Sequence, residues 1–265
     1  MTDSREHARW FRVFHETPDH ARPLVCFPHA GGAAGYYHRL SAALAPAVRV
    51  AGVQYPGRQD RLGEPAVTDL TVLADTVAAL LARRPGPPPV LFGHSMGALI
   101  AFEVAARLEH RHGRAPAGLV VSAMSAPHRC AAEAAREPAD DAAAAEELLR
   151  LGGTDPQILA DEEVRALVLS VLRGDYRAVR GYRPGSVPAP LSCPLAAFTG
   201  LDDELDAGAV RAWSGYTTAP FSLRGFPGGH FYLDGFPPAV TGAVREAVLV
   251  MTGAAPAAGS AAGRG

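Results

Sequence analysis

The stretch that decides the fold runs Pro89-Val90-Leu91-Phe92-Gly93-His94-Ser95-Met96-Gly97. An apolar run, a G-x-S-x-G pentapeptide and the start of a helical pattern follow one another directly in this stretch. The order is typical of a strand–turn–helix elbow, whose turn is so tight that only glycine fits on either side of the serine. We expect the elbow to expose the Ser95 hydroxyl at the carboxyl end of its strand. It would also leave the N–H of Met96 at a helix amino terminus, ready to donate to an oxyanion.

Apolar runs bounded by Pro, Gly or charge recur along the rest of the chain. We expect strands at residues 24–27, 48–53, 90–92, 119–121 and 195–198, with 221–226 as a candidate last strand. Continuous hydrophobicity suits strands that are covered on both faces, as in a parallel sheet. Helical spacing is found at 70–80 (behind Thr68 or Asp69 as N-cap), 96–111 and 238–251. This alternation predicts an α/β fold with a mainly parallel central sheet flanked by helices.

One interval, at about residues 126–190, breaks the alternation because it contains no convincing strand. Its second half has a helical pattern in which five apolar residues share a face: Val164, Leu167, Val168, Val171 and Leu172. We interpret the interval as a helical lid inserted in the α/β unit, the alternative being an ordinary pair of crossover helices. We expect one domain over residues 1–252. The Gly/Ala/Pro stretch at 253–265 is expected to be a disordered tail.

Composition excludes several classes of protein. The chain of 265 residues is 48% hydrophobic and 20% charged, which is enough for a buried core. Its 25 basic and 27 acidic groups leave a net charge of −2, so we expect no nucleic-acid partner. All the basic residues are Arg, so no lysine is present for a P-loop, a Schiff base or a kinase site. Three scattered Cys and the lack of an apolar leader or spanning run predict a cytoplasmic protein without a membrane partner.

A serine nucleophile needs a base, and the base needs an orienting acid. In this fold the three follow in the chain order serine, acid, histidine. His230, in the glycine-rich loop Gly228-Gly229-His230-Phe231 after the last expected strand, is our candidate base. The other histidines after Ser95 are His110, His112 and His128. The first two lie on or just past the elbow's own helix, and the third precedes any strand end that bears an acid, so all three are rejected.

Candidate acids follow the penultimate expected strand, in Gly200-Leu201-Asp202-Asp203-Glu204. We select Asp203, because it falls three residues after Gly200, where a strand-end loop presents this acid. Asp202 and Glu204 stay open as alternatives, as does the reading of all three carboxylates as a solvated turn.

The first core strand ends in Cys26-Phe27-Pro28-His29-Ala30-Gly31-Gly32, a loop able to supply a second backbone donor to an oxyanion. We assign that donor to the N–H of Ala30, with Gly31 as the alternative. His29 precedes the serine on a different loop, and we expect it to shape this loop rather than to act as the base. No metal or cofactor is expected, because no His/Asp/Glu set has ligand spacing and no G-x-G-x-x-G follows a strand.

The motifs together resemble one family. They are Cys26-Phe-Pro-His-Ala-Gly-Gly32, Tyr55-Pro-Gly-Arg-Gln-Asp-Arg61, Gly93-His-Ser-Met-Gly97, Gly200-Leu-Asp-Asp203 and Gly228-Gly-His-Phe231, in this order. From about residue 10 to 251 the sequence resembles the type II thioesterases, the stand-alone editing enzymes of polyketide and nonribosomal peptide synthesis. The lid stretches at 147–153 and 182–184 fit the family too. Residues 126–145 depart from it and leave the acyl preference open.

The resemblance implies an α/β-hydrolase fold and hydrolysis of acyl groups from the phosphopantetheine thiol of acyl- or peptidyl-carrier proteins. In the implied mechanism His230 takes the proton of Ser95, which attacks the thioester carbonyl while the N–H groups of Met96 and Ala30 hold the oxyanion. After the thiol leaves, His230 activates water, and Asp203 orients and stabilises the imidazole. A general carboxylesterase or lipase, or a non-catalytic carrier-binding protein on the same fold, remain as alternatives.

Two arginines of the second motif bear on the partner. Because carrier proteins are generally acidic, Arg58 and Arg61 near the expected entrance would steer them electrostatically. The alternative is that these arginines pair with internal acids such as Asp60 or Glu64.

Overall fold

The computed structural model describes residues 2–133, 161–184 and 189–253. Its strands are β1 (Phe11–Val13), β2 (Arg22–Phe27), β3 (Val48–Val53), β4 (Val90–His94), β5 (Gly118–Ser122), β6 (Leu195–Gly200) and β7 (Phe221–Phe226). They form one seven-stranded sheet in the order β1-β3-β2-β4-β5-β6-β7. All neighbouring strands are parallel except β1, which runs antiparallel to β3. The predicted mainly parallel sheet is confirmed, and each of the six expected strands is present.

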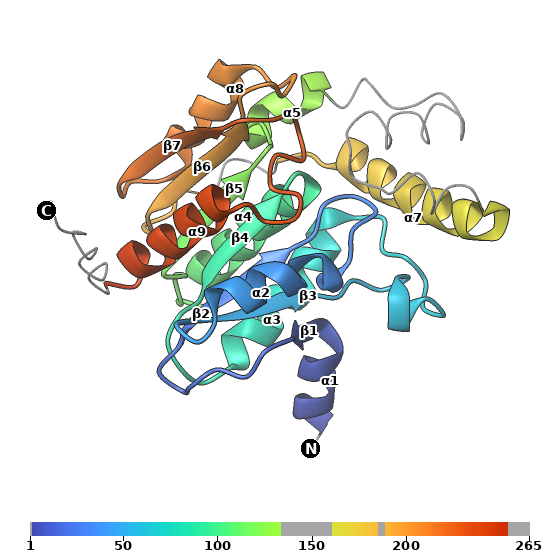
Figure 1. Cartoon of the computed structure of the whole chain (residues 1–265), viewed down its shortest axis with the longest axis horizontal. Helices are drawn as coiled ribbons and strands as arrows, with labels where there is room; N and C mark the ends of the chain where they lie inside the picture. Colours follow the sequence, from blue (N-terminus) through green and yellow to red (C-terminus); the bar gives the residue numbers. More distant parts are fainter. Residues whose placement is uncertain (1, 134–160, 185–188, 254–265) are drawn as a thin grey trace, which may run out of the picture.

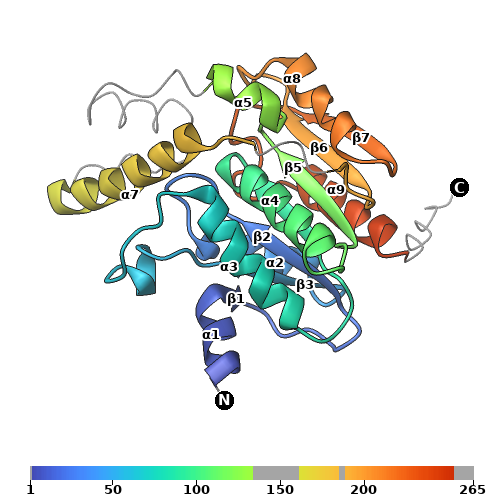
Figure 2. The same cartoon turned by 180° about the vertical axis from the view of Figure 1, so that it is seen from behind.

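Helices cover both faces of this sheet. The described α-helices are α1 (Thr2–Trp10), α2 (His38–Leu44), α3 (Leu70–Arg83), α4 (Met96–His110), α5 (Pro127–Glu133), α7 (Glu162–Gly181), α8 (Ala207–Arg211) and α9 (Pro238–Met251). Short 3₁₀ helices lie at η1 (Ala34–Tyr37), η2 (Gln59–Arg61) and η3 (Ala212–Tyr216). In Figure 1, α2 and α9 lie in front of the sheet, and Figure 2 shows α3 and α4 on the opposite face.

The core is divided by the sheet into two buried clusters, as the alternation of side chains along a strand requires. On β4, Leu91 belongs to the cluster under α3 and α4, whereas Val90 and Phe92 belong to the cluster under α2 and α9. Because both faces are covered, the central strands are apolar throughout, which is why the sequence revealed them.

The predicted helix boundaries agree closely with the structure. Helix α3 begins after Asp69, whose carboxylate accepts a hydrogen bond from the N–H of Thr71 at 2.7 Å, so Asp69 rather than Thr68 is the N-cap. Helix α9 begins at Pro238, where proline is well tolerated because the first N–H of a helix has no partner within it. Helices α1, α2 and α8 and strand β1 were not predicted from the sequence; β1 has only three residues and depends on pairing with β3.

The interval between β5 and β6 contains α5 and α7 in the residues that the structure describes, and no named strand lies there. Residues 134–160, with much of the predicted lid, and 254–265, with nearly all of the expected tail, lie outside the described part. The predicted apolar face of α7 is wrong in part. Val164 and Leu167 are 39% and 42% exposed, while Leu169, Leu172 and the carboxylic acid Asp175 are buried. The helix turns this mixed face toward the loops that follow β2 and β3.

Candidate active site

Ser95 occupies the sharp turn between β4 and α4 in a backbone conformation that serine rarely adopts, with φ 54° and ψ −125°. A Cβ at Gly93 would lie 2.1 Å from the carbonyl oxygen of Gly97, and a Cβ at Gly97 would lie 2.0 Å from that of Phe27. Both glycines are therefore required by backbone crowding, as the elbow interpretation predicted. The N–H of Ser95 donates to the carbonyl of Ser122 at 2.8 Å, which ties the turn to the neighbouring strand β5.

The structure brings together the three residues that the chain order selects. The Nε2 atom of His230 lies 3.0 Å from the Oγ of Ser95, and its Nδ1 lies 3.1 Å from an Oδ2 of Asp203. The side chains of His230 and Asp203 are only 13% and 5% exposed. Each residue follows the carboxyl end of a different parallel strand, namely β4, β6 or β7, so the sheet itself sets their separation.

The loops that carry Asp203 and His230 are in backbone contact. A Cβ at Gly200 would lie 2.1 Å from the carbonyl oxygen of Gly229, so only glycine permits this approach. Asp202, the alternative acid, is exposed and accepts a hydrogen bond from the N–H of Gly228 at 3.2 Å instead of reaching the imidazole. Its role is to join the two loops.

The loop after β2 presents a backbone donor near the elbow. It turns tightly, because the N–H of Gly32 donates to the carbonyl of His29 at 3.0 Å. The N–H of Gly31 is occupied, since it donates to Asp175 of α7 at 2.7 Å. The N–H of Ala30 has no hydrogen-bond partner among the described residues. Of the two donors considered from the sequence, Ala30 is thus the one available, while Met96, as the first residue of α4, also has an N–H outside the helical ladder.

Two further histidines line the interior of the site and are buried. The ring of His94 lies 5.3 Å from that of His230 and 5.9 Å from that of His29 (centroid distances). Burial, reinforced by the nearby His230, lowers the pKa of His29 to about 3 and that of His94 well below its ordinary value. Both imidazoles are therefore neutral at neutral pH. This fits the expectation that His29 shapes its loop rather than acting as the base.

His94 belongs to a buried hydrogen-bonded network that sequence reasoning missed. Its Nδ1 lies 2.9 Å from the Oγ of Ser122, which in turn lies 2.6 Å from the hydroxyl of Tyr232. The network connects the elbow, β5 and the loop that carries His230. His94 fills a position that the G-x-S-x-G pattern leaves free, so no spacing rule marks it.

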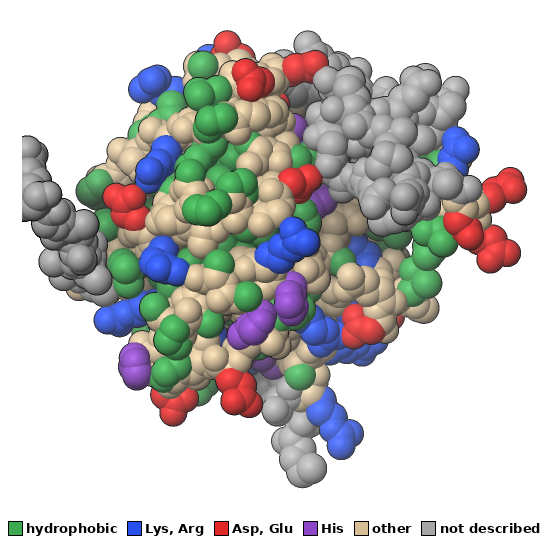
Figure 3. All heavy atoms as spheres, in the orientation of Figure 1, with side chains coloured by type: hydrophobic (Ala, Val, Ile, Leu, Met, Phe, Trp, Pro, Cys, Tyr) green, Lys and Arg blue, Asp and Glu red, His purple; other side chains and the backbone are tan. Residues whose placement is uncertain are grey.

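The prediction that Arg58 and Arg61 steer an acidic partner is wrong, because each side chain is only 5–6% exposed. Arg61 forms a bidentate pair with Glu64, at 2.7 Å for both contacts, as the alternative proposed. Arg58 pairs instead with Asp175 of α7, a contact that no local sequence pattern predicts. On the face drawn in Figure 3, basic and acidic side chains that reach the surface are interspersed.

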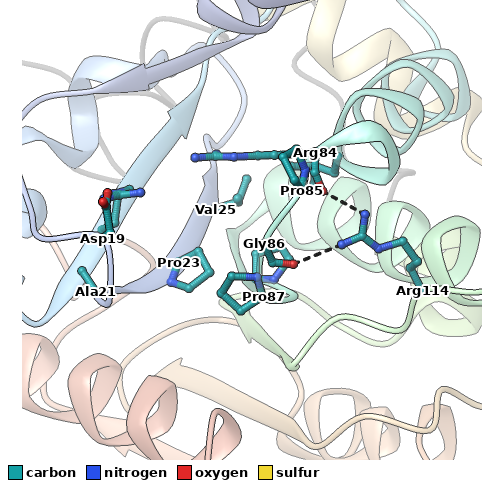
Figure 4. A pocket seen from close by; sticks show the side chains of 12 residues that line it. Asp19, Ala21, Pro23, Val25, Arg84, Pro85, Gly86, Pro87 and Arg114 are labelled. Carbon is teal, nitrogen blue, oxygen red and sulfur yellow. Dashed lines mark hydrogen bonds and ion pairs between the residues drawn. The ribbon is translucent and has the colours of Figure 1, made fainter.

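A separate pocket of about 170 Å³ lies at the opposite rim of the sheet. It is lined by residues that precede β2 and β4, including Ala21 and Pro89, and by Arg84 and Arg114 after α3 and α4 (Figure 4). Arg114 donates to the carbonyls of Arg84 and Gly86, so it closes the end of α3. No serine or histidine lines this pocket. Within residues 2–133, 161–184 and 189–253, no cluster of His, Cys, Asp and Glu is suited to a metal ion.

Comparison with known proteins decides the family. The model of the thioesterase domain matches residues 22–247, which include every residue of the site described above. The chain belongs to the thioesterase family. By its family it is a thioester hydrolase. In the part of the chain that the structure describes, no helix is long and apolar enough to span a membrane.

The relatives and solved structures that this chain resembles include thioesterases of biosynthetic clusters. It is 45% identical over 254 residues to a probable cadicidin biosynthesis thioesterase of Streptomyces griseus, covering 95% of this chain and 69% of that protein. It is 43% identical over 251 residues to the thioesterase PikA5 of Streptomyces venezuelae, covering 92% and 87%. The solved structure of BorB, a type II thioesterase from the borrelidin biosynthetic cluster, superposes with a TM-score of 0.77 at 41% identity, covering 90% and 97%. The chain has the fold of this type II thioesterase, an α/β-hydrolase fold.

Proposed function

We propose that this thioesterase hydrolyses acyl thioesters by a two-step acyl transfer through Ser95, His230 and Asp203. The observation that carries the proposal is the continuous chain of contacts from Asp203 through the imidazole to the Ser95 hydroxyl, at 3.1 and 3.0 Å. His230 accepts the Ser95 proton as Oγ attacks the thioester carbonyl. The tetrahedral intermediate then collapses, the C–S bond breaks, and the imidazolium returns its proton to the leaving thiolate.

In the second step the same imidazole deprotonates a water molecule, which attacks the acyl-serine ester. Collapse of the second intermediate breaks the ester C–O bond, returns a proton to Ser95 and releases a carboxylic acid. Asp203 fixes the tautomer of His230 that presents Nε2 to the serine, and stabilises the imidazolium that forms twice per turnover. The N–H groups of Met96 and Ala30 are the proposed oxyanion donors.

The substrate class that we propose is an acyl or peptidyl chain carried on the phosphopantetheine thiol of a carrier protein in a polyketide or nonribosomal peptide synthase. It is supported by the names of the relatives, which include a type II thioesterase of the borrelidin cluster. We place residues 1–252 in one domain and assign α7 to a lid, because its buried face contacts loops beside the proposed oxyanion donors.

Mass spectrometry of a panel of acylated carrier proteins, before and after incubation with the enzyme, tests the proposal. The wild type should release free carrier thiol, and Ser95→Ala should not. Full activity of that variant would refute the assignment. A p-nitrophenyl ester assayed in parallel separates a thioesterase from a general carboxylesterase.

The neighbouring acids supply a matched control pair. Asp203→Asn should lower kcat by about 10⁴-fold, because the imidazole is then held in the wrong tautomer. Asp202→Asn changes the adjacent carboxylate, which contacts Gly228 rather than the imidazole, and should retain most of the activity. Equal losses in the two variants would contradict the choice of Asp203.

A further inference from the structure

A carboxylate of the helix α7 reaches the backbone of the proposed oxyanion loop, residues 28–32. The side chain of Asp175 is 3% exposed, and one of its oxygens accepts the N–H of Gly31 at 2.7 Å. Its other oxygen pairs with the guanidinium of Arg58, which also donates to the carbonyl of Gly32. Asp175 and Arg58 thus hold the peptide group that precedes Gly31 and the one that follows Gly32.

Arg58 is itself held in place by the protein interior. Its guanidinium lies over the ring of Tyr55, 4.8 Å from the ring centroid, and its carbonyl accepts a hydrogen bond from the side-chain amide of Gln54 at 3.0 Å. The same Gln54 side chain accepts the N–H of Ala34 at 3.1 Å, just beyond the oxyanion loop. The pair therefore joins three segments, namely α7, the oxyanion loop and the loop after β3.

Burying the Asp175–Arg58 pair costs desolvation free energy, which a purely structural contact would not need. Desolvation raises the pKa of Asp175, against the opposing influence of Arg58 and of the Gly31 N–H. Buried ion pairs are weak sources of stability, because the desolvation of both charges offsets their attraction. A pair retained here is better explained by what its geometry does for the adjacent backbone.

The geometry determines which amide of the loop is left free to donate. With the N–H of Gly31 fixed on Asp175, and Gly31 at φ +78°, the preceding amide of Ala30 is left without a partner in the described structure. Rotation of this short turn would exchange or misdirect these donors. An oxyanion hole works only when its donors are already aimed at the developing charge.

We propose that Asp175 and Arg58 are positioning residues for hydrolysis, which hold the oxyanion loop so that the N–H of Ala30 points toward the carbonyl oxygen of the substrate. The inference rests on the proposed function of Ser95. It couples the packing of α7 to the orientation of the oxyanion loop, because the carboxylate of Asp175 takes part in both.

The decisive variant replaces the whole pair with apolar residues of similar volume, Arg58→Met together with Asp175→Leu. Such replacements of buried pairs are often neutral or stabilising for the fold. The variant should therefore unfold near the wild-type temperature, yet its kcat on an acyl-pantetheine thioester should fall at least about 10-fold, since loss of one oxyanion donor costs 10²–10³-fold. KM should change less than about 2-fold, because ground-state binding does not use the oxyanion hole.

A transition-state analogue separates positioning from general damage. The affinity for a trifluoromethyl ketone, which forms a tetrahedral adduct on the serine, should fall by the same factor as kcat/KM. The affinity for the matching unreactive methylene ketone should be unchanged. Arg58→Lys is the milder variant, and its loss should be smaller but of the same kind, because an ammonium lacks the planar fork that serves two acceptors at once.

The matched control is a second buried pair, Arg107 with Glu103 on α4, whose further partners are Asp75 and the hydroxyl of Tyr182 rather than the oxyanion loop. Its apolar replacement, Arg107→Met with Glu103→Leu, should leave kcat near the wild-type value. A folded Arg58→Met/Asp175→Leu enzyme with unchanged kcat and analogue affinity would overturn the proposal, as would an equal loss of kcat in the control. Failure of the wild type to hydrolyse thioesters or to be labelled at Ser95 by a fluorophosphonate would instead overturn the proposed function.

Discussion

The two buried histidines beside the proposed base should make this protein sensitive to mild acid. His29 and His94 have pKa values lowered by burial, to about 3 for His29, whereas in the unfolded chain each would titrate near 6.5. As the pH falls through about 6.5, the two imidazoles bind protons in the unfolded chain but stay neutral in the folded protein. Stability therefore rises with pH in this range and is lost as the pH falls.

The magnitude follows from the same values. One proton of difference corresponds to about 1.4 kcal/mol per pH unit, so integrating from about pH 7.5 to about pH 5 gives a loss of about 2 kcal/mol for His29. Burial also lowers the folded pKa of His94, so it should add a loss of the same sign. Together these losses are a large fraction of the stability of a typical domain.

The assay is urea unfolding at a series of pH values, comparing the wild type with His29→Gln, His94→Gln and the double variant. The readout is the slope of the unfolding free energy against pH, so the stability change that each substitution causes by itself does not enter. His29→Gln should lose a slope of about one proton between about pH 5 and pH 6, and His94→Gln should lower the slope in the same direction. A wild-type slope retained in the double variant would refute the reasoning, because it would show that these imidazoles titrate alike in both states.

Three further changes have definite expected outcomes. Gly97→Ala puts a methyl group 2.0 Å from the carbonyl oxygen of Phe27, so we expect little folded protein, and a soluble, active variant would contradict the crowding of the elbow. Arg61→Ala removes a buried guanidinium that pairs with the partly exposed Glu64 and donates to the carbonyl of Gln54, and should destabilise by about 1–3 kcal/mol in urea unfolding, whereas the exposed Arg9→Ala should cost less than about 1 kcal/mol; unchanged stability of the Arg61 variant would show that these contacts contribute nothing to folding. Ser122→Ala removes the shared partner of a buried imidazole and a phenol, at a cost of about 1–3 kcal/mol, while an isosteric Ser122→Cys should recover part of it.

The sheet could be predicted because its chemistry is local. Runs such as that at β4 are apolar on both faces and are flanked by turn-forming or charged residues. Each of these strands can therefore be predicted from its own residues, without knowledge of its neighbours. Strand β1 could not be predicted, because Phe11–Val13 is too short to show a pattern and forms a strand by pairing with β3. Helix α1 was missed too, since its apolar content is low.

The residues of the site whose chain order is constrained could be predicted from the sequence. Polar residues that are buried against distant partners could not. Ser95, Asp203 and His230 were selected from order and spacing, and the structure places them in hydrogen-bond contact; their catalytic roles stay proposals. Periodicity assumes that apolar side chains face inward, and α7 departs from that assumption by burying Asp175 while exposing Leu167. An acid buried against a partner 117 positions away has no signature in the local sequence.

The main-chain contact between Gly200 and Gly229 has a practical consequence for engineering. Because no side chain separates the segments that carry the acid and the base, neither segment can be lengthened, shortened or exchanged alone without pushing the other out of register. Any chimera that borrows one of these loops from a relative must import its counterpart as well, so they form the smallest transplantable module of this enzyme.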